Sequence, residues 1–283
     1  MKLYPALDVR STADLVLALV DDFSPSAVET GADAMRLFFP AADARDAACA
    51  ELRAHGYTTV PLEVSDEDWA RRSQQDLAPI EIGRITIFPT PDSRIPTNPG
   101  SQVVPNPTSR IPNLDKYFLT ILPSMGFGTG HHATTRLCLE ALQEIDVTGA
   151  FFLDVGTGSG VLAIAADLLG AAAALGLDCD EDAIQSARQN LALNPSATHT
   201  SFDTRDVTAA PLPDADILAA NLTGALLVRA APALLAATRR GGTIILSGIL
   251  AEEGDAVRHA FSGADVVEQR RDAEWLCLRL TQR

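Results

Sequence analysis

Cysteine is scarce in this chain of 283 residues, which contains only four cysteines, Cys49, Cys138, Cys179 and Cys277. They lie far apart in the sequence, and none belongs to a Cys-x-x-Cys pair or has a partnered histidine. Zinc sites and disulfide frameworks show closely spaced ligands or paired cysteines, so we expect neither here, and no bound metal. Scattered cysteines fit a reducing cytoplasm, where we expect the protein to be located.

Basic residues are also few compared with acidic ones. The chain has 22 lysines and arginines against 37 aspartates and glutamates, which gives a net charge of −15. This excess of acid argues against broad, nonspecific binding to nucleic acid or anionic lipid, because both attract basic surfaces. The charge is compatible with a basic protein partner, or it only maintains solubility.

A long apolar run without charge is missing from the N-terminal residues, where Asp8, Asp14, Asp21 and Asp22 interrupt the apolar stretch. We therefore expect neither a signal peptide nor a membrane span. The composition, 47% hydrophobic and 21% charged, excludes wholesale disorder. The length is sufficient for two domains of unequal size.

The first 63 residues predict a small α+β domain. An apolar-periodic segment covers Ala13–Val20, a strand is expected at Met35–Phe39, and a helix is expected at Ala41–His55, where Gly56 ends it. A linker helix is predicted for residues 64–78, because acidic residues follow Ser65 and Pro79 stops the pattern.

Residues 79–283 predict a larger α/β domain. Isoleucines between Ile80 and Ile87 indicate strand structure, residues 89–113 are rich in proline and predict a loop, and Tyr117–Leu122 predicts another strand. Beyond these, runs of strand length alternate with helical stretches, which is typical of a parallel sheet covered on both faces. These runs are Phe151–Val155, Ala173–Leu177, Asp216–Ala220 and Thr243–Leu246, followed by a predicted antiparallel hairpin of Val266–Gln269 and Trp275–Leu280.

A glycine-rich loop follows the first strand of this alternation, with glycines at Gly156, Gly158 and Gly160 before an apolar helix. Glycine permits a sharp turn and the close approach of a ligand to the backbone. A dinucleotide fingerprint requires glycine or alanine where Val161 stands. The spacing instead suits a nucleoside with an amino-acid tail, although such loops also occur for packing reasons alone.

Polar residues follow the next strands. Asp178 lies 22 residues beyond Gly156, at a strand end from which a carboxylate can accept hydrogen bonds from both ribose hydroxyls. Asp180 is expected to cap the helix that follows it. Asp206 can reach an adenine amino group or is a solvated loop acid. Asn221 ends the fourth apolar run, either as a ligand-binding side chain at the sheet edge or as a helix cap.

A second glycine-rich segment, Met125–Leu137, precedes the sheet and contains adjacent histidines, His131 and His132. Consecutive residues on a helix diverge and no third ligand is in register, so we expect hydrogen bonding or capping rather than metal binding. Thr134 and Thr135 lie near the start of the predicted helix.

Together these motifs resemble the PrmA-type methyltransferases, which modify ribosomal protein L11 of the large subunit. The chain matches the family's Phe-Gly-Thr-Gly-x-His-x-Thr-Thr segment from Phe127 to Thr135 and its Asp-x-Gly-x-Gly-Ser-Gly loop from Asp154 to Gly160. The family's strand-end acid and asparagine match Asp178 and Asn221, and its Leu-Ser-Gly-Ile-Leu stretch appears at Leu246–Leu250. The resemblance covers roughly residues 64–283.

The resemblance implies a Rossmann-like, seven-stranded class I methyltransferase sheet, mostly parallel, with a small N-terminal α+β domain that recognises the substrate. It implies S-adenosylmethionine as cofactor, bound through Thr135, Gly156, Asp178 and Asn221. The acceptors would be lysine amines of a large-subunit ribosomal protein, with or without an N-terminal α-amine. The remaining cofactor residues that we expect are Phe127, Thr134, Asp154, Gly158, Gly160 and Asp206.

The expected catalytic residues are Asn221, whose side-chain oxygen would orient the acceptor amine, and His132 as a proton acceptor. Two departures from the family pattern stand out: Thr157 replaces a small residue, usually cysteine, and Asn221 is followed by Leu222-Thr223-Gly224 where the family often has Ile-Leu-Ala. The first should matter little, and the second changes the lip of the acceptor pocket.

Other functions remain open. The acceptor could be another protein, such as an electron-transfer flavoprotein, or a small amine. The sheet could instead serve a nicotinamide-dependent oxidoreductase or a noncatalytic binding module. We expect a monomer that binds neither nucleic acid directly nor membranes.

Overall fold

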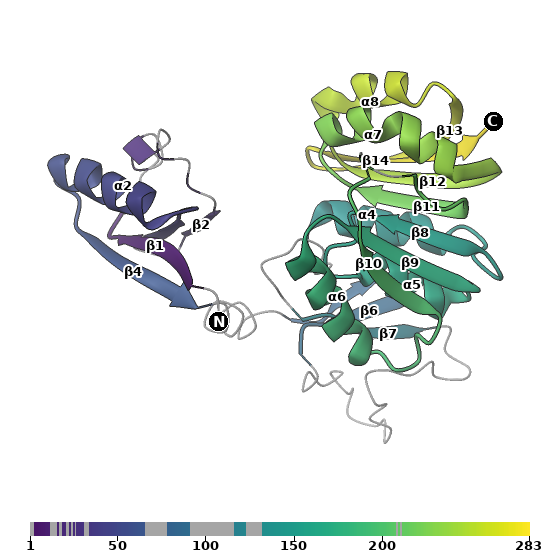
Figure 1. Ribbon diagram of the computed structural model, residues 1–283, viewed down its shortest axis with the longest axis horizontal. Coiled ribbons are helices and arrows are strands. Elements are labelled where there is room, and N and C mark those ends of the chain that lie inside the picture. Colours follow the sequence, from purple (N-terminus) through teal and green to yellow (C-terminus); the bar gives the residue numbers. More distant parts are fainter. Residues whose placement is uncertain are drawn as a thin grey trace. The chain divides into compact units, whose positions relative to one another are not determined.

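The computed structural model divides the chain into two compact units, Met1–Asp76 and Leu77–Arg283 (Figure 1). The residues that it describes are 3–11, 16, 19–20, 23, 25, 27–30, 34–65, 78–90, 116–122, 132–207, 209 and 211–283. Each unit has its own hydrophobic core. The predicted loop at 89–113 and the glycines of the second glycine-rich segment fall mainly or wholly outside the described residues.

The first unit contains an antiparallel sheet with the strand order β2-β3-β1-β4. Its strands are β1 (Leu3–Val9), β2 (Ala27–Thr30), β3 (Met35–Phe38) and β4 (Thr59–Ser65), and its helix is α2 (Ala42–Ala54). Alternation along the strands buries one set of side chains, including Leu7 and Leu37, against Leu52 of the helix. The predicted strand at Met35 and the predicted helix at Ala41 are confirmed, but the sequence did not predict the other three strands.

The predicted linker helix begins too early at residue 64. Val64 and Ser65 are the last two residues of β4, where they pair with β1 at Tyr4 and Leu3. The acidic residues after Ser65 suggested a helix start, but the pairing with β1 extends the strand to Ser65. Residues 66–77 of that predicted helix lie outside the described residues.

The second unit is built on a sheet of seven strands in the order β10-β9-β8-β11-β12-β14-β13. All pairings from β10 to β12 are parallel, and β14 runs antiparallel to both of its neighbours. This confirms the predicted α/β class and the final hairpin. The strands are β8 (Phe151–Val155), β9 (Ala173–Asp178), β10 (Thr200–Thr204), β11 (Ala215–Asn221), β12 (Thr238–Leu250), β13 (Ala264–Asp272) and β14 (Trp275–Gln282).

Helices cover both faces of this sheet (Figure 1). One buried cluster joins a sheet face to α4 (Ala133–Gln143), α5 (Val161–Leu169) and α6 (Glu181–Ala192). A second cluster joins the opposite face to α7 (Gly224–Ala237) and α8 (Gly254–Ala260). Strand residues therefore alternate between two apolar layers, as Phe152 and Leu153 do, which explains the continuous apolar runs in the sequence.

A smaller sheet of three strands, β5 (Ile80–Ile82), β6 (Ile85–Phe88) and β7 (Tyr117–Thr120), contributes to the first of these clusters. Gly83 forms the β5–β6 turn with a φ of +57°, in the left-handed region. The isoleucine-rich stretch, for which strand structure was predicted, forms the antiparallel pair β5 and β6. No helix among the described residues combines the length and the apolar character needed to cross a membrane.

Strand order reverses at β8, whose neighbours are β9 on one side and β11 on the other. The crossover connections from the two sides leave in opposite directions at such a point, and open α/β sheets bind ligands in the crevice that results. The fold therefore places the β8–α5 glycine loop, the end of β9 and the end of β11 around one position.

Candidate functional site

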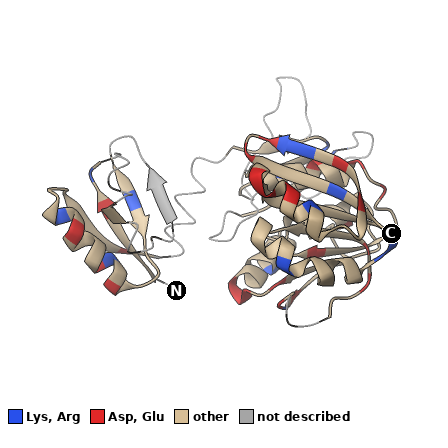
Figure 2. Ribbon diagram, turned by 90° about the horizontal axis from the view of Figure 1, so that it is seen from above, with Lys and Arg blue, Asp and Glu red and all other residues tan. Residues whose placement is uncertain are grey.

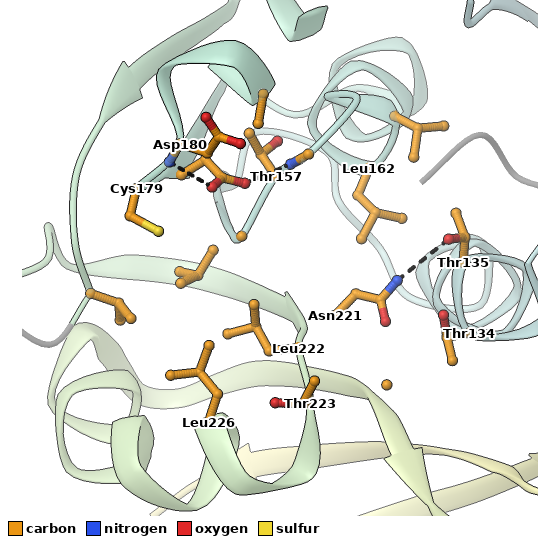
Figure 3. A pocket seen from close by; sticks show the side chains of 18 of the residues that line it. Thr134, Thr135, Thr157, Leu162, Cys179, Asp180, Asn221, Leu222, Thr223 and Leu226 are labelled. Atoms are coloured by element: carbon orange, nitrogen blue, oxygen red, sulfur yellow. Dashed lines mark hydrogen bonds between the residues drawn. The ribbon is translucent and has the colours of Figure 1, made fainter. Parts of the chain in front are cut away.

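A cavity of about 600 Å³ opens at this reversal point, at the carboxyl ends of the parallel strands. It is bounded by the β8–α5 loop, the ends of β9 and β11, and the first turn of α4 (Figure 3). Most of the predicted site residues lie together on its wall. They are His132, Thr134, Thr135, Gly156, Gly158, Asp178, Asp206 and Asn221.

The glycine loop is held in place by its own backbone amides. Gly156 and Thr157 donate to the Leu177 carbonyl at 2.8 and 2.9 Å, and Gly160 donates to the Thr157 carbonyl at 2.9 Å. Gly158 donates to the Asp178 carboxylate at 3.0 Å. Four amides of the loop are therefore already paired with protein acceptors.

Gly160 does not line the cavity, although the sequence grouped it with the cofactor residues. It precedes α5 with a φ of +81°, and a Cβ atom at this position would lie 2.6 Å from the Phe202 ring. Both the left-handed backbone and this contact require glycine. Its role in the structure is to let α5 begin close to β10.

Asp178 lies at the edge of the cavity and connects two of its walls. Its Oδ2 accepts from Gly158 N at 3.0 Å and its Oδ1 accepts from Asp180 N at 3.1 Å. Each carboxylate oxygen has more than one acceptor position, so both retain capacity for a ligand hydroxyl. The predicted capping role of Asp180 is confirmed, since its carboxylate accepts from Asp182 N at 2.9 Å.

Asp154 lies beneath the loop rather than on the cavity wall, in contrast to its predicted place among the cofactor residues. It is 1% exposed, and its Oδ2 accepts a 2.6 Å hydrogen bond from the Thr157 hydroxyl. Burial, with the nearby Asp178 charge as a smaller contribution, raises the pKa of Asp154 to about 7. Thr157, the partner of this carboxyl, does line the cavity.

Asn221 ends β11 and turns its side chain toward α4. Its Nδ2 donates to the Thr135 hydroxyl at 3.4 Å, which joins two of the predicted cofactor residues (Figure 3). The alternative role as a helix cap does not hold, because α7 begins after Thr223, its N-cap residue. With the amide nitrogen directed at Thr135, the side-chain oxygen is the end of Asn221 suited to receive a donor from a substrate.

His132 caps α4, as the sequence predicted for hydrogen bonding or capping. Its Nδ1 lies 3.4 Å from Thr134 N and 2.9 Å from the Thr134 hydroxyl. The ring also packs edge-on against Trp275, with 5.0 Å between the ring centroids. Phe127 and His131 lie outside the described residues.

The sequence reasoning missed Trp275 and most of the apolar wall. Trp275 opens β14 and pairs with Leu250 near the carboxyl end of β12. Because β14 runs against its neighbours, its first residue must lie where they end, so the predicted hairpin contained a signal that could have located it. The other cavity residues not predicted include Val155, Val161, Leu162, Leu226, Arg205 and Arg229, whereas Leu222 was expected at the lip of the pocket.

Comparison with known proteins gives a consistent result. The family model described as "Ribosomal protein L11 methyltransferase (PrmA)" matches residues 32–283. The match thus begins well upstream of residue 64, where the motifs themselves begin to resemble the family.

Two curated relatives and one solved structure illustrate the similarity. A ribosomal protein L11 methyltransferase of Pelobacter propionicus is 38% identical over 223 residues, which cover 76% of this chain and 67% of that protein. Its counterpart in Geobacter metallireducens is 41% identical over 220 residues, which cover 75% and 66%. The matched part thus spans about two thirds of these relatives' own length. The crystal structure of a ribosomal protein L11 methylase from Lactobacillus delbrueckii subsp. bulgaricus has a TM-score of 0.59 at 24% identity, covering 73% of this chain and 98% of that one.

Proposed function

The chain belongs to the ribosomal protein L11 methyltransferase (PrmA) family, and on that premise we propose that it transfers methyl groups from S-adenosylmethionine to lysine amines of a large-subunit ribosomal protein. The observation that carries the proposal is the placement of Asp178 and Asn221 on one cavity at the reversal point of the sheet. An N-terminal α-amine of the same substrate would be a further acceptor of the same chemistry.

The residues of the cavity fit a nucleoside with an amino-acid tail. Gly156, Thr157, Gly158 and Gly160 already donate their amides to protein acceptors, and these amides would otherwise be the groups that bind a pyrophosphate. Val161 N, at the start of α5, lies 3.4 Å from the Ser159 hydroxyl. A ligand without phosphate therefore suits this loop, which counts against a nicotinamide dinucleotide.

Asp178 would hold the ribose. The two amides that donate to its carboxylate keep the group fixed, and each oxygen can accept one more hydrogen bond from a ribose hydroxyl. Thr134 and Thr135 face the cavity from α4, and Asp206 faces it from the segment after β10. We assign the last of these to the adenine amino group.

When bound, S-adenosylmethionine supplies an electrophilic methyl group. The protein's own work is to position the acceptor amine and to keep water out of the site. Free lysine has a pKa of about 10.4, so the ammonium must lose a proton before it can act as a nucleophile. Leu222, Leu226 and Trp275 make part of the wall apolar, which disfavours the charged ammonium and lowers that pKa.

Asn221 would orient the neutral amine. Its side-chain oxygen accepts a hydrogen bond from an amine N–H and so directs the nitrogen lone pair, while Thr135 fixes the amide group from the other end. His132 Nδ1 is occupied by the cap of α4, so a role in accepting the released proton would fall to Nε2.

Cofactor choice can be tested through a cysteine in the cavity. Cys179 is exposed and lines the cavity beside Asp178, whereas Cys49, Cys138 and Cys277 are buried. A small maleimide should therefore react mainly at Cys179, and bound S-adenosylmethionine should slow that reaction. We expect no protection by NADH at the same concentration; protection by NADH alone would instead support an oxidoreductase.

The substrate is tested by mass spectrometry of purified ribosomal protein L11 incubated with the protein and S-adenosylmethionine. We expect mass increases in whole methyl steps, assigned by fragmentation to lysines. The matched control is Asn221→Ala, which should bind the cofactor and transfer little. If L11 stays unmodified while a small amine or another protein in a cell extract is methylated, the substrate assignment is wrong and the methyltransferase assignment stands.

A further inference from the structure

Two buried asparagines lie four residues apart, Asn190 in the last turn of α6 and Asn194 two residues after that helix ends, each 1% exposed. Both side chains reach the segment at the end of β7, because Asn190 accepts from Leu122 N and Asn194 accepts from Thr120 N. Buried amides require hydrogen-bond partners, and the partners of these two amides differ in a way that bears on the cofactor site.

The Asn194 side chain forms hydrogen bonds with the backbone of β7 in the three-stranded sheet. Its Oδ1 accepts from Thr120 N at 2.9 Å, and its Nδ2 donates to the Thr120 carbonyl at 2.8 Å and to the Asn190 carbonyl at 2.7 Å. Thr120 is the last residue of β7. The side chain therefore pairs with an edge of β7 as a neighbouring strand would, and none of these bonds reaches the cavity.

Asn190 joins the small sheet to the glycine loop. Its Oδ1 accepts from Leu122 N at 2.9 Å, just after β7, and its Nδ2 donates to the Ser159 carbonyl at 2.9 Å. Ser159 lies within the loop, between Gly158 and Gly160, and is fully buried. One amide group thus ties the loop to a segment outside the seven-stranded sheet.

Ser159 directly follows Gly158, the loop residue whose amide contacts Asp178. The Gly158 amide donates to the Asp178 carboxylate at 3.0 Å, and the carbonyl of the following residue is held from the other side by Asn190. Gly158 and Gly160 both have positive φ, at +52° and +81°, so flexible residues flank the held peptide. Glycine at both positions leaves this peptide able to adopt other conformations, so hydrogen bonds from outside the loop help to fix it.

We propose that Asn190 is a positioning residue of the cofactor site, which holds the Ser159 carbonyl so that the Gly158 amide stays directed at Asp178. The inference rests on the proposed function, since it takes the loop and Asp178 to bind S-adenosylmethionine. Without the Asn190 donor, the buried Ser159 carbonyl loses a hydrogen bond that fixes its direction. The neighbouring Gly158 amide is then less firmly directed at Asp178, whose carboxylate keeps only the hydrogen bond from Asp180 N in full.

The test compares Asn190→Ala with Asn194→Ala in the full chain. The two variants remove the same kind of side chain at the same burial, one in the last turn of α6 and one just after the helix ends, and both should lower the denaturation midpoint. Binding of S-adenosylmethionine is measured by calorimetry at a temperature where circular dichroism shows both variants folded. We expect Asn190→Ala to raise the Kd about tenfold, with a matching rise in KM and little change in kcat, and Asn194→Ala to leave the Kd within about twofold.

Asn190→Asp is a second variant, which keeps the acceptor oxygen of the side chain and removes its N–H donor. It takes the place of the alanine variant if that one unfolds. A carboxylate still accepts from Leu122 N but has no donor for the Ser159 carbonyl. It should weaken binding as the alanine variant does, and protonation of the aspartate at lower pH should restore part of the affinity relative to wild type.

The outcomes separate the inference from the function on which it rests. If the wild type binds S-adenosylmethionine and both Asn190 variants bind it as tightly, the positioning role is wrong and the proposed function stands. An equal rise in Kd for the Asn190 and Asn194 variants has the same meaning, because it shows a general loss of packing. If the wild type does not bind S-adenosylmethionine, both the proposed function and the inference are wrong.

Discussion

The hydroxyl of Thr157 donates a 2.6 Å hydrogen bond to the buried carboxyl of Asp154, directly beneath the cavity wall. The resemblance to the family marks threonine at position 157 as a departure from the usual small residue, and the sequence alone predicted little effect. In the structure, threonine at this position strengthens the hydrogen bond to Asp154, because a threonine hydroxyl is a stronger donor than a cysteine thiol. The hydrogen bond favours the ionised carboxyl, while burial and Asp178 favour the protonated one.

Replacing Asp154 with asparagine should change how stability depends on pH. The pKa of Asp154 is about 7 in the folded protein against 3.8 for an exposed carboxyl, so the folded state binds a proton that the unfolded state has released. The stability contributed by this proton is complete below about pH 4 and is lost as the pH rises to about 7. The loss is on the order of 4 kcal/mol, and Asp154→Asn should not show it. Urea denaturation of both proteins at pH 4 and pH 8 measures the difference.

Thr157→Val is the control for that experiment. It removes the donor that stabilises the ionised form, so the pKa of Asp154 should rise further and the loss of stability should move to higher pH. Identical pH dependence in the wild type and Asp154→Asn would show that the buried carboxyl does not hold the proton.

Gly160→Ala should destabilise the protein more than Gly56→Ala, although both glycines have a φ near +80°. A left-handed backbone costs an alanine about 1–2 kcal/mol at either position. Only at Gly160 would the new Cβ meet other atoms, with the Phe202 ring at 2.6 Å, while at Gly56 nothing lies within 4 Å. The overpacking adds about 1–3 kcal/mol, which comparison of the two unfolding curves measures. Equal losses would mean that Phe202 moves aside at no cost.

The larger domain was predictable because its local patterns and its fold agree. Apolar runs such as Phe151–Val155 are strands buried on both faces, and glycines and capping acids mark the ends of the helices between them. Asp178 and Asn221 could be placed together because the carboxyl ends of parallel strands share one edge. The sequence could not show which side chains are buried. Asp154 and Asp178 are both acids at strand ends, but the packing buries Asp154 and leaves Asp178 on the cavity wall.

The smaller domain was harder to predict because proline occurs within its strands. Pro5 lies in β1 and Pro61 in β4, and proline normally argues against a strand. In the structure β4 is an edge strand, where a missing N–H is tolerated, and the Pro5 carbonyl accepts from Phe39 N at 2.9 Å. Pairing between distant segments determined these strands, and this pairing has no local signature.

Asn221→Ala should reduce turnover far more than cofactor binding. The side-chain oxygen is proposed to orient the acceptor amine, and the loss of one positioning group in a reacting complex costs about 100-fold or more in rate. The effect on α7 should be small, because the N-cap of this helix is Thr223. Single-turnover methylation of ribosomal protein L11 and calorimetric binding of S-adenosylmethionine separate the two quantities. A variant with full turnover would remove Asn221 from the mechanism.

Methylation of a lysine-rich protein should slow as salt is added. The chain carries a net charge of −15, and Figure 2 shows acidic and basic residues interspersed over the described parts of both units, so attraction arises from the overall excess of acid. Long-range attraction of this kind raises association rates and is screened beyond about 8 Å at 0.15 M salt. We expect kcat/KM for the ribosomal protein to fall by about tenfold between 0.02 and 0.3 M salt, with kcat at saturating substrate nearly constant. Binding of S-adenosylmethionine, measured over the same range, controls for salt effects on the cavity itself. If kcat/KM stays constant while binding does too, the acidic surface serves solubility and not the capture of the substrate.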